Sequence, residues 1–235
     1  MVYVGYLIIN HKYERGQDRH EEWHDAITDL CSQSGPLIRK LADSLHQKVT
    51  DRVGHVEITD WSMVKERCDD VCKCTYEFTR KIATRGDKFS VSIFLKKVEN
   101  EENYYNMISR ISYDGHCPAS YNVFRKESEI ASYYYVGLFK KSITKPSILA
   151  TKEAIEGAFC DTDGVNYSQY VAIPIACTGN KMIALLQIVA YEDSIIAKDR
   201  DEIEKIAGNY LSSYTNLVLL TDKVDHVVHN WSKGV

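Results

Sequence analysis

Two runs of strand-forming residues joined by a tight turn constrain the fold more than any other part of the sequence. Ser168 to Cys177 and Lys181 to Tyr191 flank the tripeptide Thr178-Gly179-Asn180. Gly beside Asn is typical of a short turn between antiparallel strands. The pattern predicts an antiparallel hairpin in the central layer of a sheet, and the interpretation of the rest of the chain depends on it.

A second pair of runs lies upstream of this hairpin. Phe89 to Leu95 and Tyr105 to Ile111 both alternate, and Glu- and Asn-rich residues separate them. Such alternation predicts two more strands, paired as another antiparallel hairpin. Between the two hairpins, Glu127 to Lys141 is interpreted as a helix and Ser147 to Ala150 as a short strand.

Helices are predicted at both ends of this set of strands. Asp60 is a suitable N-cap for a helix that continues to about Thr84, because its carboxylate can accept the free amides of the first turn. The last element, Lys198 to Val224, begins with an acidic turn, which suits the positive end of the helix dipole. The order of elements predicts an α+β fold, in which terminal helices cover one face of an antiparallel sheet.

Further helices are predicted before this domain. Apolar side chains recur there at helical spacing, and Leu37, Leu41 and Leu45 share one helical face. We interpret residues 1–60 as an N-terminal helical extension and residues 61–235 as a single domain.

Charge and cysteine content narrow the class of protein. The 235-residue chain has a formal net charge of -4, which argues against a nucleic-acid-binding surface. The apolar start, Val2 to Ile9, is far shorter than the roughly 20 residues that cross a bilayer, and its basic residues follow rather than precede it. The seven cysteines are an odd number, which indicates reduced thiols. We expect a cytoplasmic protein with neither a nucleic-acid nor a membrane partner.

Three strings carry a resemblance to a known family. Tyr170 to Ile175, followed by Ile183 to Ile188, is similar to a proline-containing strand and the strand after its hairpin, and Asp199 to Ile203 is similar to the start of a closing helix. Residues 61–224 thereby resemble the GAF family of small-molecule-sensing domains, which are related to PAS domains. The resemblance implies a GAF-like antiparallel sheet and a non-catalytic sensor or regulatory role.

Two subtypes of that family have motifs that this sequence lacks. Members that bind cyclic nucleotides carry an Asn-Lys pair where this chain has Ala190-Tyr191. Bilin-binding photoreceptors use a Cys followed by His, and here the order is His116-Cys117. We therefore expect neither a cyclic nucleotide of that subtype nor a covalently attached pigment.

The resemblance also implies a ligand pocket between the sheet and its cover, which in this chain runs from Asp114 to Gln169. That cover is rich in aromatic residues, and aromatic walls with one or two charges suit a small planar or anionic ligand. The alternative, left open, is that these aromatics only fill the core. The candidate ligand-binding residues are Arg110, Phe124, Arg125, Tyr134, Phe139 and Tyr167.

Two patterns are similar to metal sites. His20-Glu21-Glu22-Trp23-His24 has the zincin spacing, but its flanks are charged and it precedes the recognisable domain. Cys68 and Cys72 share a helical face, whereas Cys74 points away from it. We interpret the first pattern as a solvated helix and the cysteines as small core hydrophobes. No metal and no cofactor are expected.

The leading hypothesis is a sensor that binds a small molecule and signals through a homodimer, formed by the leucine face of residues 37–45 and by the last helix. A second hypothesis is a thiol-dependent reductase, because the region of Cys160 loosely resembles the thiol region of free-methionine-sulfoxide reductases; Cys117 and Cys160 would be its thiols. A third is a pure protein-interaction module with no ligand.

Overall fold

The computed structural model describes Asp25, Leu37 and residues 62–118, 121–159, 166–176, 182–211 and 214–218. Its named helices are α2 (Ser62–Ile82), α3 (Tyr134–Lys141), α4 (Lys152–Ala158) and α5 (Arg200–Lys205), which continues as the π-helical turn Ile206–Tyr210. Residues 214–218 form the last described helical segment. Its strands are β1 (Phe89–Glu99), β2 (Glu102–Ser112), β3 (Arg125–Lys126), β4 (Ser147–Leu149), β5 (Tyr167–Ala176) and β6 (Met182–Tyr191).

The strands form one sheet in the order β3-β2-β1-β6-β5-β4, and every neighbouring pair is antiparallel. Both predicted hairpins, β1–β2 and β5–β6, are confirmed, and β1 joins them by pairing with β6. The turn predicted at Thr178-Gly179-Asn180 lies outside the described residues. The β5–β6 hairpin thus belongs to the central part of the sheet, as the sequence predicts.

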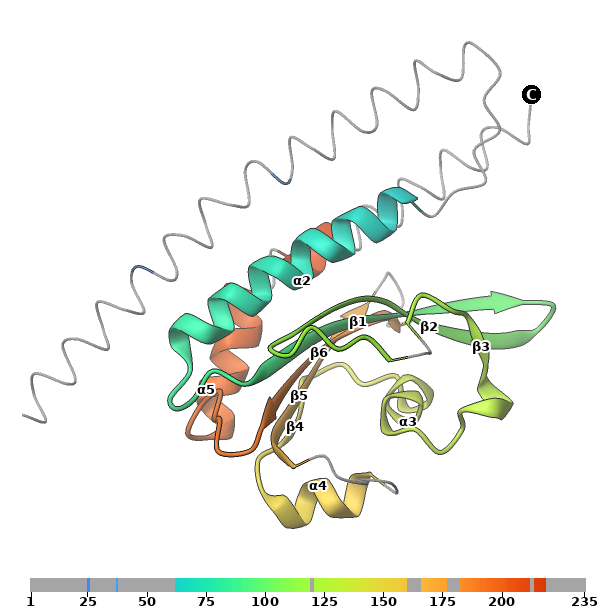
Figure 1. The fold of residues 1–235 in the computed structure, drawn as a ribbon. Coiled ribbons are helices and arrows are strands. Elements are labelled where there is room, and N and C mark those ends of the chain that lie inside the picture. The colour runs from blue at the N-terminus through green and yellow to red at the C-terminus, as the bar shows by residue number, and fades with distance from the viewer. Residues whose placement is uncertain are drawn as a thin grey trace, which may run out of the picture.

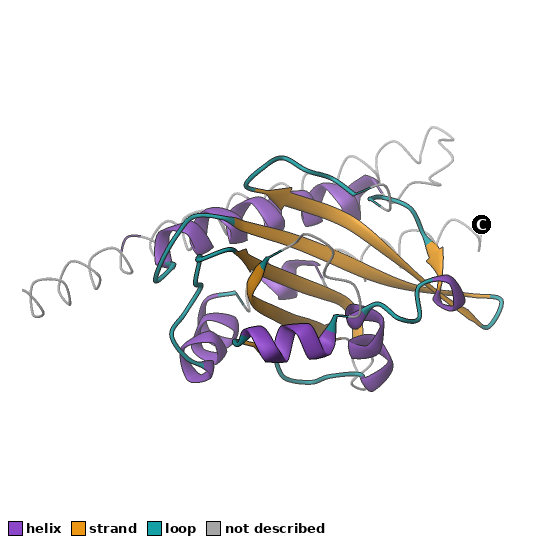
Figure 2. Cartoon of the chain, turned by 60° about the horizontal axis from the view of Figure 1, so that its bottom comes forward, coloured by secondary structure: helices purple, strands orange, loops and turns teal. Residues whose placement is uncertain are grey.

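The two faces of the sheet carry different helices, as Figures 1 and 2 show. Phe89, Val91 and Ile93 of β1 point to the face that packs against α2 and the last helical segment, in one buried apolar cluster. The alternate side chains, such as Phe94, point to the opposite face, where α3 and α4 lie. The prediction of an α+β fold with terminal helices on one face is confirmed.

The described part of α2 begins at Ser62, the predicted cap Asp60 lies outside the described residues, and the helix ends at Ile82, close to the predicted Thr84. The six side chains that share its predicted apolar face are 2% exposed or less, and they are Val64, Cys68, Val71, Thr75, Phe78 and Ile82. Cys72 and Cys74 are buried in the same cluster. The interpretation of these three cysteines as core hydrophobes is confirmed.

Two predicted helices differ in detail. The helix expected at 127–141 begins only at Tyr134, after a 3₁₀ turn at Glu127–Glu129, and it ends where Ser142 adopts φ 46°. The last helix begins as expected: Asp199 Oδ1 accepts the Glu202 amide at 2.8 Å, and Glu202 Oε2 accepts the Lys198 amide at 2.9 Å. This reciprocal capping fixes the first turn, but the backbone then widens into a π-helical turn.

Most of residues 1–60 lies outside the described residues, so the helical extension and its boundary with the domain stay predictions. Two positions there are described. Asp25 is helical and exposed, and Leu37 is helical and only 6% exposed, buried in the same cluster as α2. Among the described helices, none has the length and apolar character needed to cross a bilayer.

Candidate functional site

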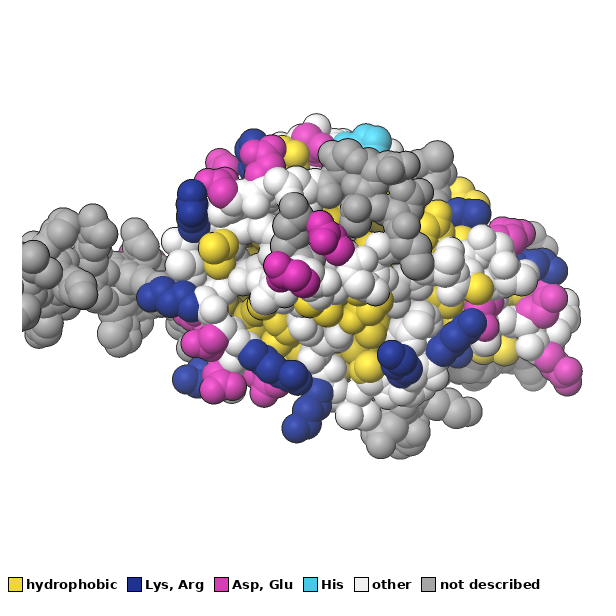
Figure 3. Space-filling model, turned by 90° about the horizontal axis from the view of Figure 1, so that it is seen from below, with side chains coloured by type: hydrophobic (Ala, Val, Ile, Leu, Met, Phe, Trp, Pro, Cys, Tyr) yellow, Lys and Arg dark blue, Asp and Glu magenta, His cyan; other side chains and the backbone are white. Residues whose placement is uncertain are grey.

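A cavity of about 610 Å³ lies on the sheet face that carries α3 and α4. Its floor comes from β1, β2 and β6, and its walls from α3, the loop after β2 and the start of β5. Seen from this side, apolar side chains gather near the centre of the face, and charged side chains surround them (Figure 3). The volume lies within the range of small-molecule pockets.

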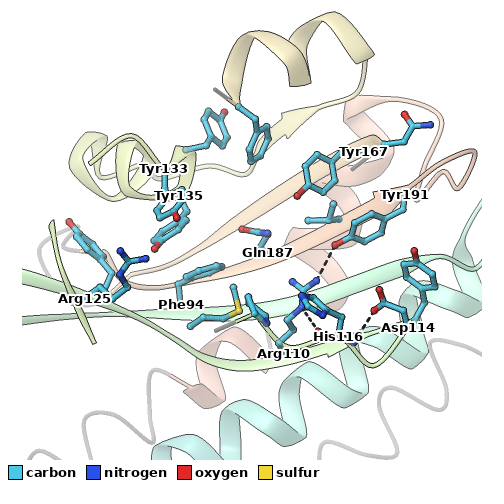
Figure 4. Close-up of a pocket in the computed structure, with 18 of the residues that line it drawn as sticks. Phe94, Arg110, Asp114, His116, Arg125, Tyr133, Tyr135, Tyr167, Gln187 and Tyr191 are labelled. Atoms are coloured by element: carbon cyan, nitrogen blue, oxygen red, sulfur yellow. Dashed lines mark hydrogen bonds between the residues drawn. The ribbon is translucent and has the colours of Figure 1, made fainter. Parts of the chain in front are cut away.

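The floor of the cavity contains one polar cross-strand row. Arg110 on β2 pairs in register with Ser92 on β1, and Ser92 pairs with Gln187 on β6. Side chains that are directly opposite each other on adjacent antiparallel strands project from the same face. Arg110 and Gln187 both line the cavity (Figure 4), and they come from the two strands that flank β1.

The Arg110 guanidinium is held by three hydrogen bonds. Its Nε donates to the backbone carbonyl of His116 at 3.1 Å, and its two terminal nitrogens donate to Ser92 Oγ at 3.2 Å and to Tyr191 Oη at 3.1 Å. The Tyr191 hydroxyl also lies 2.8 Å from the buried Ser90 hydroxyl. The guanidinium is therefore fixed in position by neutral acceptors alone.

The two cations of the cavity differ in their partners. Within the described ranges, no carboxylate lies within ion-pair distance of Arg110, which is partly buried. Arg125, at the other end of the cavity, has Glu129 as a partner at 3.8 Å (Figure 4). Asp114 also lines the cavity, but it accepts from the Ser112 hydroxyl and the His116 amide. Arg110 is thus the cation of the cavity that has no carboxylate partner among the described residues.

Aromatic rings form one wall of the cavity. Phe94 and Tyr135 stack with centroids 4.2 Å apart and an interplanar angle of 26°, and Tyr133 and Tyr135 stack with centroids 5.8 Å apart. Burial raises the pKa of Tyr135 to about 12, because the phenolate would lose its hydration. The wall therefore stays neutral at physiological pH and offers flat apolar surface.

A second aromatic group closes the opposite side. Tyr167 lies between Phe159 and Tyr191, with centroid distances of 5.4 Å to each ring. Burial raises the pKa of Tyr167 as well. Tyr134 contacts Phe159 at 5.3 Å, and its hydroxyl lies 3.1 Å from Ser147 Oγ. These contacts join β5, α3 and the end of α4 around the cavity.

A partly buried polar contact anchors α3 and its preceding turn to the sheet. Tyr105, which lines the cavity, donates its hydroxyl to Glu127 Oε2 at 2.7 Å, and Asn103 Nδ2 donates to the same oxygen at 2.9 Å. Lys140 Nζ lies 3.1 Å from the other carboxylate oxygen. The hydrogen bond from Tyr105 contributes most to the lowering of the Glu127 pKa, because it stabilises the ionised form.

The structure brings together four of the six predicted site residues. Arg110, Arg125, Tyr134 and Tyr167 line the cavity. The other two lie elsewhere. Phe139 is 2% exposed and packs in the core against Tyr105, with centroids 5.0 Å apart. Phe124 does not line the cavity, and Lys97 Nζ lies 5.6 Å from its ring centroid.

Apart from Arg110, the polar residues in and beside the cavity floor are not among the predicted site residues. The sequence places Ser92, Gln187 and Tyr191 in strands without indicating a role for them. The signal was present in the alternation: even-numbered residues of β1 and odd-numbered residues of β6 share one face, opposite the apolar face of Val91 and Ile188. A serine at the centre of a strand, beside Gln and Arg on its neighbours, marks the polar row.

The other chemical patterns in the sequence lie apart from this cavity. The zincin-like motif at 20–24 and Cys160 lie outside the described residues. Cys117 is exposed in the loop after β2. In the part of the chain that the structure describes, no cluster of three or more His, Cys, Asp or Glu side chains has the arrangement of a metal site.

No protein-family model and no curated protein matches the chain. Similar solved structures are GAF domains, the family that the sequence resembles. The GAF domain of an Acinetobacter phosphoenolpyruvate-protein phosphotransferase has 11% identity, with 78% of this chain and 95% of that chain covered and a TM-score of 0.47. The phycoerythrobilin-bound GAF domain of a cyanobacterial phytochrome has 11% identity, coverages of 83% and 97%, and a TM-score of 0.49.

The GAF domain of a Coxiella burnetii phosphoenolpyruvate-protein phosphotransferase has 12% identity, coverages of 83% and 96%, and a TM-score of 0.42. These likenesses concern the fold, and they assign neither a ligand nor an activity to this chain.

Proposed function

We propose that this chain is a non-catalytic sensor or regulatory domain of the GAF-like type, and that its cavity binds a small planar molecule with an anionic group. One observation carries the proposal. Arg110 places a partly buried guanidinium at an aromatic cavity, and its three hydrogen bonds go only to neutral acceptors.

The energetics favour an anion at this position. Removing a cation from water is costly unless an opposite charge replaces part of its hydration. A carboxylate, sulfonate or phosphate at the guanidinium of Arg110 gains charge-assisted hydrogen bonds, which are about twice as strong as neutral ones. The stacked rings of Phe94 and Tyr135 supply apolar surface for the planar part of the ligand. A planar anion satisfies both features of the cavity.

Two fluorescent probes that differ in one group test the proposal. Anilinonaphthalene sulfonate and phenylnaphthylamine share their ring system, and only the first carries a sulfonate. Titration of the full chain is expected to show tighter binding of the sulfonate. Arg110→Gln is expected to weaken sulfonate binding about 10- to 100-fold and to leave binding of the neutral probe nearly unchanged, since one charged hydrogen-bonding group is lost.

Arg125→Gln is the matched control, because Arg125 lines the same cavity but has Glu129 as its partner. It is expected to change sulfonate binding less than threefold, roughly the effect of an exposed charge. Equal losses in the two variants would show that overall positive charge, rather than the Arg110 site, attracts the probe. Absence of binding by either probe would contradict a ligand-binding cavity.

We further propose that the domain acts as a homodimer through its helices. Leu37 is buried within a single chain and is therefore not available to a partner copy, whereas Leu41 and Leu45 lie outside the described residues and stay predicted interface residues. Light scattering of the full chain at high micromolar concentration is expected to give twice the mass of one chain. A mass of one chain would contradict the dimer.

We also propose that the protein is cytoplasmic. All seven cysteines are then expected to be free thiols in protein isolated without reductant and counted after unfolding. A lower count would indicate disulfides and contradict that location.

A further inference from the structure

We propose that Gln187 is a specificity-determining residue: with Arg110 it selects planar anions that also carry a carbonyl oxygen or another hydrogen-bond acceptor. This inference rests on the function proposed above. It goes further by naming a second polar contact and a narrower ligand class.

The orientation of the Gln187 side chain follows from its neighbour. Tyr170 is 1% exposed, and its hydroxyl lies 3.2 Å from Gln187 Oε1, to which it donates. Burial raises the pKa of Tyr170 well above its usual value, so the hydroxyl keeps its proton. A buried hydroxyl without an acceptor costs free energy. Tyr170 therefore holds the oxygen end of the amide and acts as a positioning residue.

The nitrogen end of the same amide faces the cavity. Gln187 lines the cavity and projects from β6 into the space between the sheet and α3 (Figure 4). With Oε1 held by Tyr170, the Nε2 group presents its hydrogens to that space. A ligand group opposite Gln187 must consequently accept a hydrogen bond. A donor there, such as an amine, would meet another donor.

The Arg110 and Gln187 contacts lie close enough to act on one small molecule. Both residues are register partners of Ser92, so their backbones are roughly 10 Å apart, twice the spacing of neighbouring strands. The bond from Arg110 to Ser92 Oγ draws the guanidinium toward β1, and thus toward Gln187. An anionic group and a carbonyl oxygen separated by one or two fused rings match this spacing.

The aromatic wall orients such a ligand beside the row. Phe94 comes from the neighbouring position of the same face of β1, and Tyr135 stacks on it. A flat ring system in contact with these residues has its edge, rather than its face, directed at the polar row. Carbonyl oxygens and carboxylates lie at the edges of aromatic rings, where Arg110 and Gln187 can contact them.

Two tricyclic probes separate this proposal from the simpler one. Anthraquinone sulfonate and anthracene sulfonate have the same outline and the same charge, and only the first has ring carbonyls. Calorimetric titration of the full chain is expected to show about three- to tenfold tighter binding of anthraquinone sulfonate, the usual effect of one hydrogen bond. Arg110→Gln is expected to weaken both probes by a similar factor.

Substitution of Gln187 must abolish the preference between the probes. Gln187→Leu removes the amide donor. Gln187→Glu also removes the donor but keeps an acceptor for Tyr170. In both variants, the ratio of the affinity for anthraquinone sulfonate to that for anthracene sulfonate is expected to fall to about one or below. Tyr170→Phe frees the amide to rotate and is expected to reduce the ratio partly. Thermal unfolding checks that each variant folds, and the ratio is measured within one folded variant, so a general loss of stability does not change it.

The outcomes distinguish the two proposals. Equal binding of the probes to the unsubstituted chain, or a preference that survives both Gln187 substitutions, would overturn the role of Gln187 and leave the anion site intact. If neither probe binds, the ligand-binding cavity itself is contradicted. A preference that disappears on loss of Gln187 but persists in Arg125→Gln supports the inference.

Discussion

Arg110 donates a hydrogen bond to the Tyr191 hydroxyl at 3.1 Å, although the two residues come from strands that β1 separates. The bond crosses β1 on the cavity side, where Ser90 and Ser92 provide short side chains. Tyr191 is the last residue of β6, directly before the segment that leads to α5. The charge at the cavity is thereby connected to the beginning of the closing helix.

Tyr191→Phe is expected to destabilise the fold by about 1–3 kcal/mol, because it leaves the buried Ser90 hydroxyl and one Arg110 nitrogen without their partner. Urea unfolding measures the loss. Anionic probes are expected to bind the variant at least as tightly, since a guanidinium nitrogen is freed. Tyr113→Phe, in a ring that also packs against Tyr191 but is 40% exposed, is the control and is expected to change stability by less than about 0.5 kcal/mol.

Gly86→Ala is expected to cost about 2–4 kcal/mol of stability. Gly86 has φ +69°, and a Cβ there would lie 2.8 Å from the backbone Cα of buried Ser194, so left-handed strain adds to a steric clash. The contact joins the segment after α2 to the segment before α5. Gly115→Ala is the matched control: it has φ +68° with open space around it, and it is expected to cost only about 1–2 kcal/mol. Equal losses in the two variants would show that the clash is absent.

The sheet and its helices could be predicted from the sequence because they depend on local periodicity. The alternation in Phe89 to Leu95 and the apolar positions of α2 identify which side chains share a face. What covers each face is decided by distant residues. Ser90 and Ser92 alternate with apolar residues as on a solvated face, yet both are at most 1% exposed, because Tyr191 and Arg110 from the neighbouring strands hydrogen-bond to their hydroxyls.

The sequence predicts the candidate site only in part, for a related reason. The aromatic residues of the cover are identified by residue type, and residue type alone does not give the direction in which a side chain points. Phe139 and Tyr135 are four residues apart on α3, but their rings contact different strands: Phe139 packs in the core against Tyr105 of β2, and Tyr135 stacks on Phe94 of β1 at the cavity. Gln187 was missed because its role comes from Tyr170 on the neighbouring strand, a relationship that only the register reveals.

Acidic pH is expected to weaken the contact between α3 and the sheet through Glu127. Its pKa is lowered chiefly by the hydrogen bond from Tyr105, so the folded chain holds the ionised form more strongly than the unfolded chain does. This contribution to stability is present above the unfolded pKa of about 4.3 and is lost as pH falls through the lower folded pKa. Urea unfolding midpoints measured between pH 7 and pH 3 give the slope of stability against pH.

Two substitutions test whether Glu127 causes this pH dependence of stability. Glu127→Gln removes the titrating group and is expected to give a flatter dependence below about pH 4.5. Tyr105→Phe removes the main cause of the lowered pKa and is expected to flatten the dependence partly. If both variants lose stability in parallel with the original chain, Glu127 does not contribute to the acid sensitivity.

Alkaline pH is expected to act on the aromatic wall of the cavity. Burial against Phe94 raises the pKa of Tyr135 to about 12, compared with about 10 in an unfolded chain, so the folded state keeps its proton while the unfolded state loses it. The contribution of Tyr135 to stability is complete below about pH 10 and is lost as pH rises through about 12.

Tyr135→Phe keeps the stacked ring without the ionisable hydroxyl. The variant is expected to have the same free energy of unfolding as the original chain at pH 7 and a free energy of unfolding about 1–2 kcal/mol higher near pH 12. This difference is reduced because the ring is partly exposed to solvent. Burial also raises the pKa of Tyr170, so the variant still weakens with pH, but less steeply. Urea unfolding between pH 8 and 12 tests the difference, and identical slopes in the two proteins would show that Tyr135 ionises as readily in the folded chain as in the unfolded one.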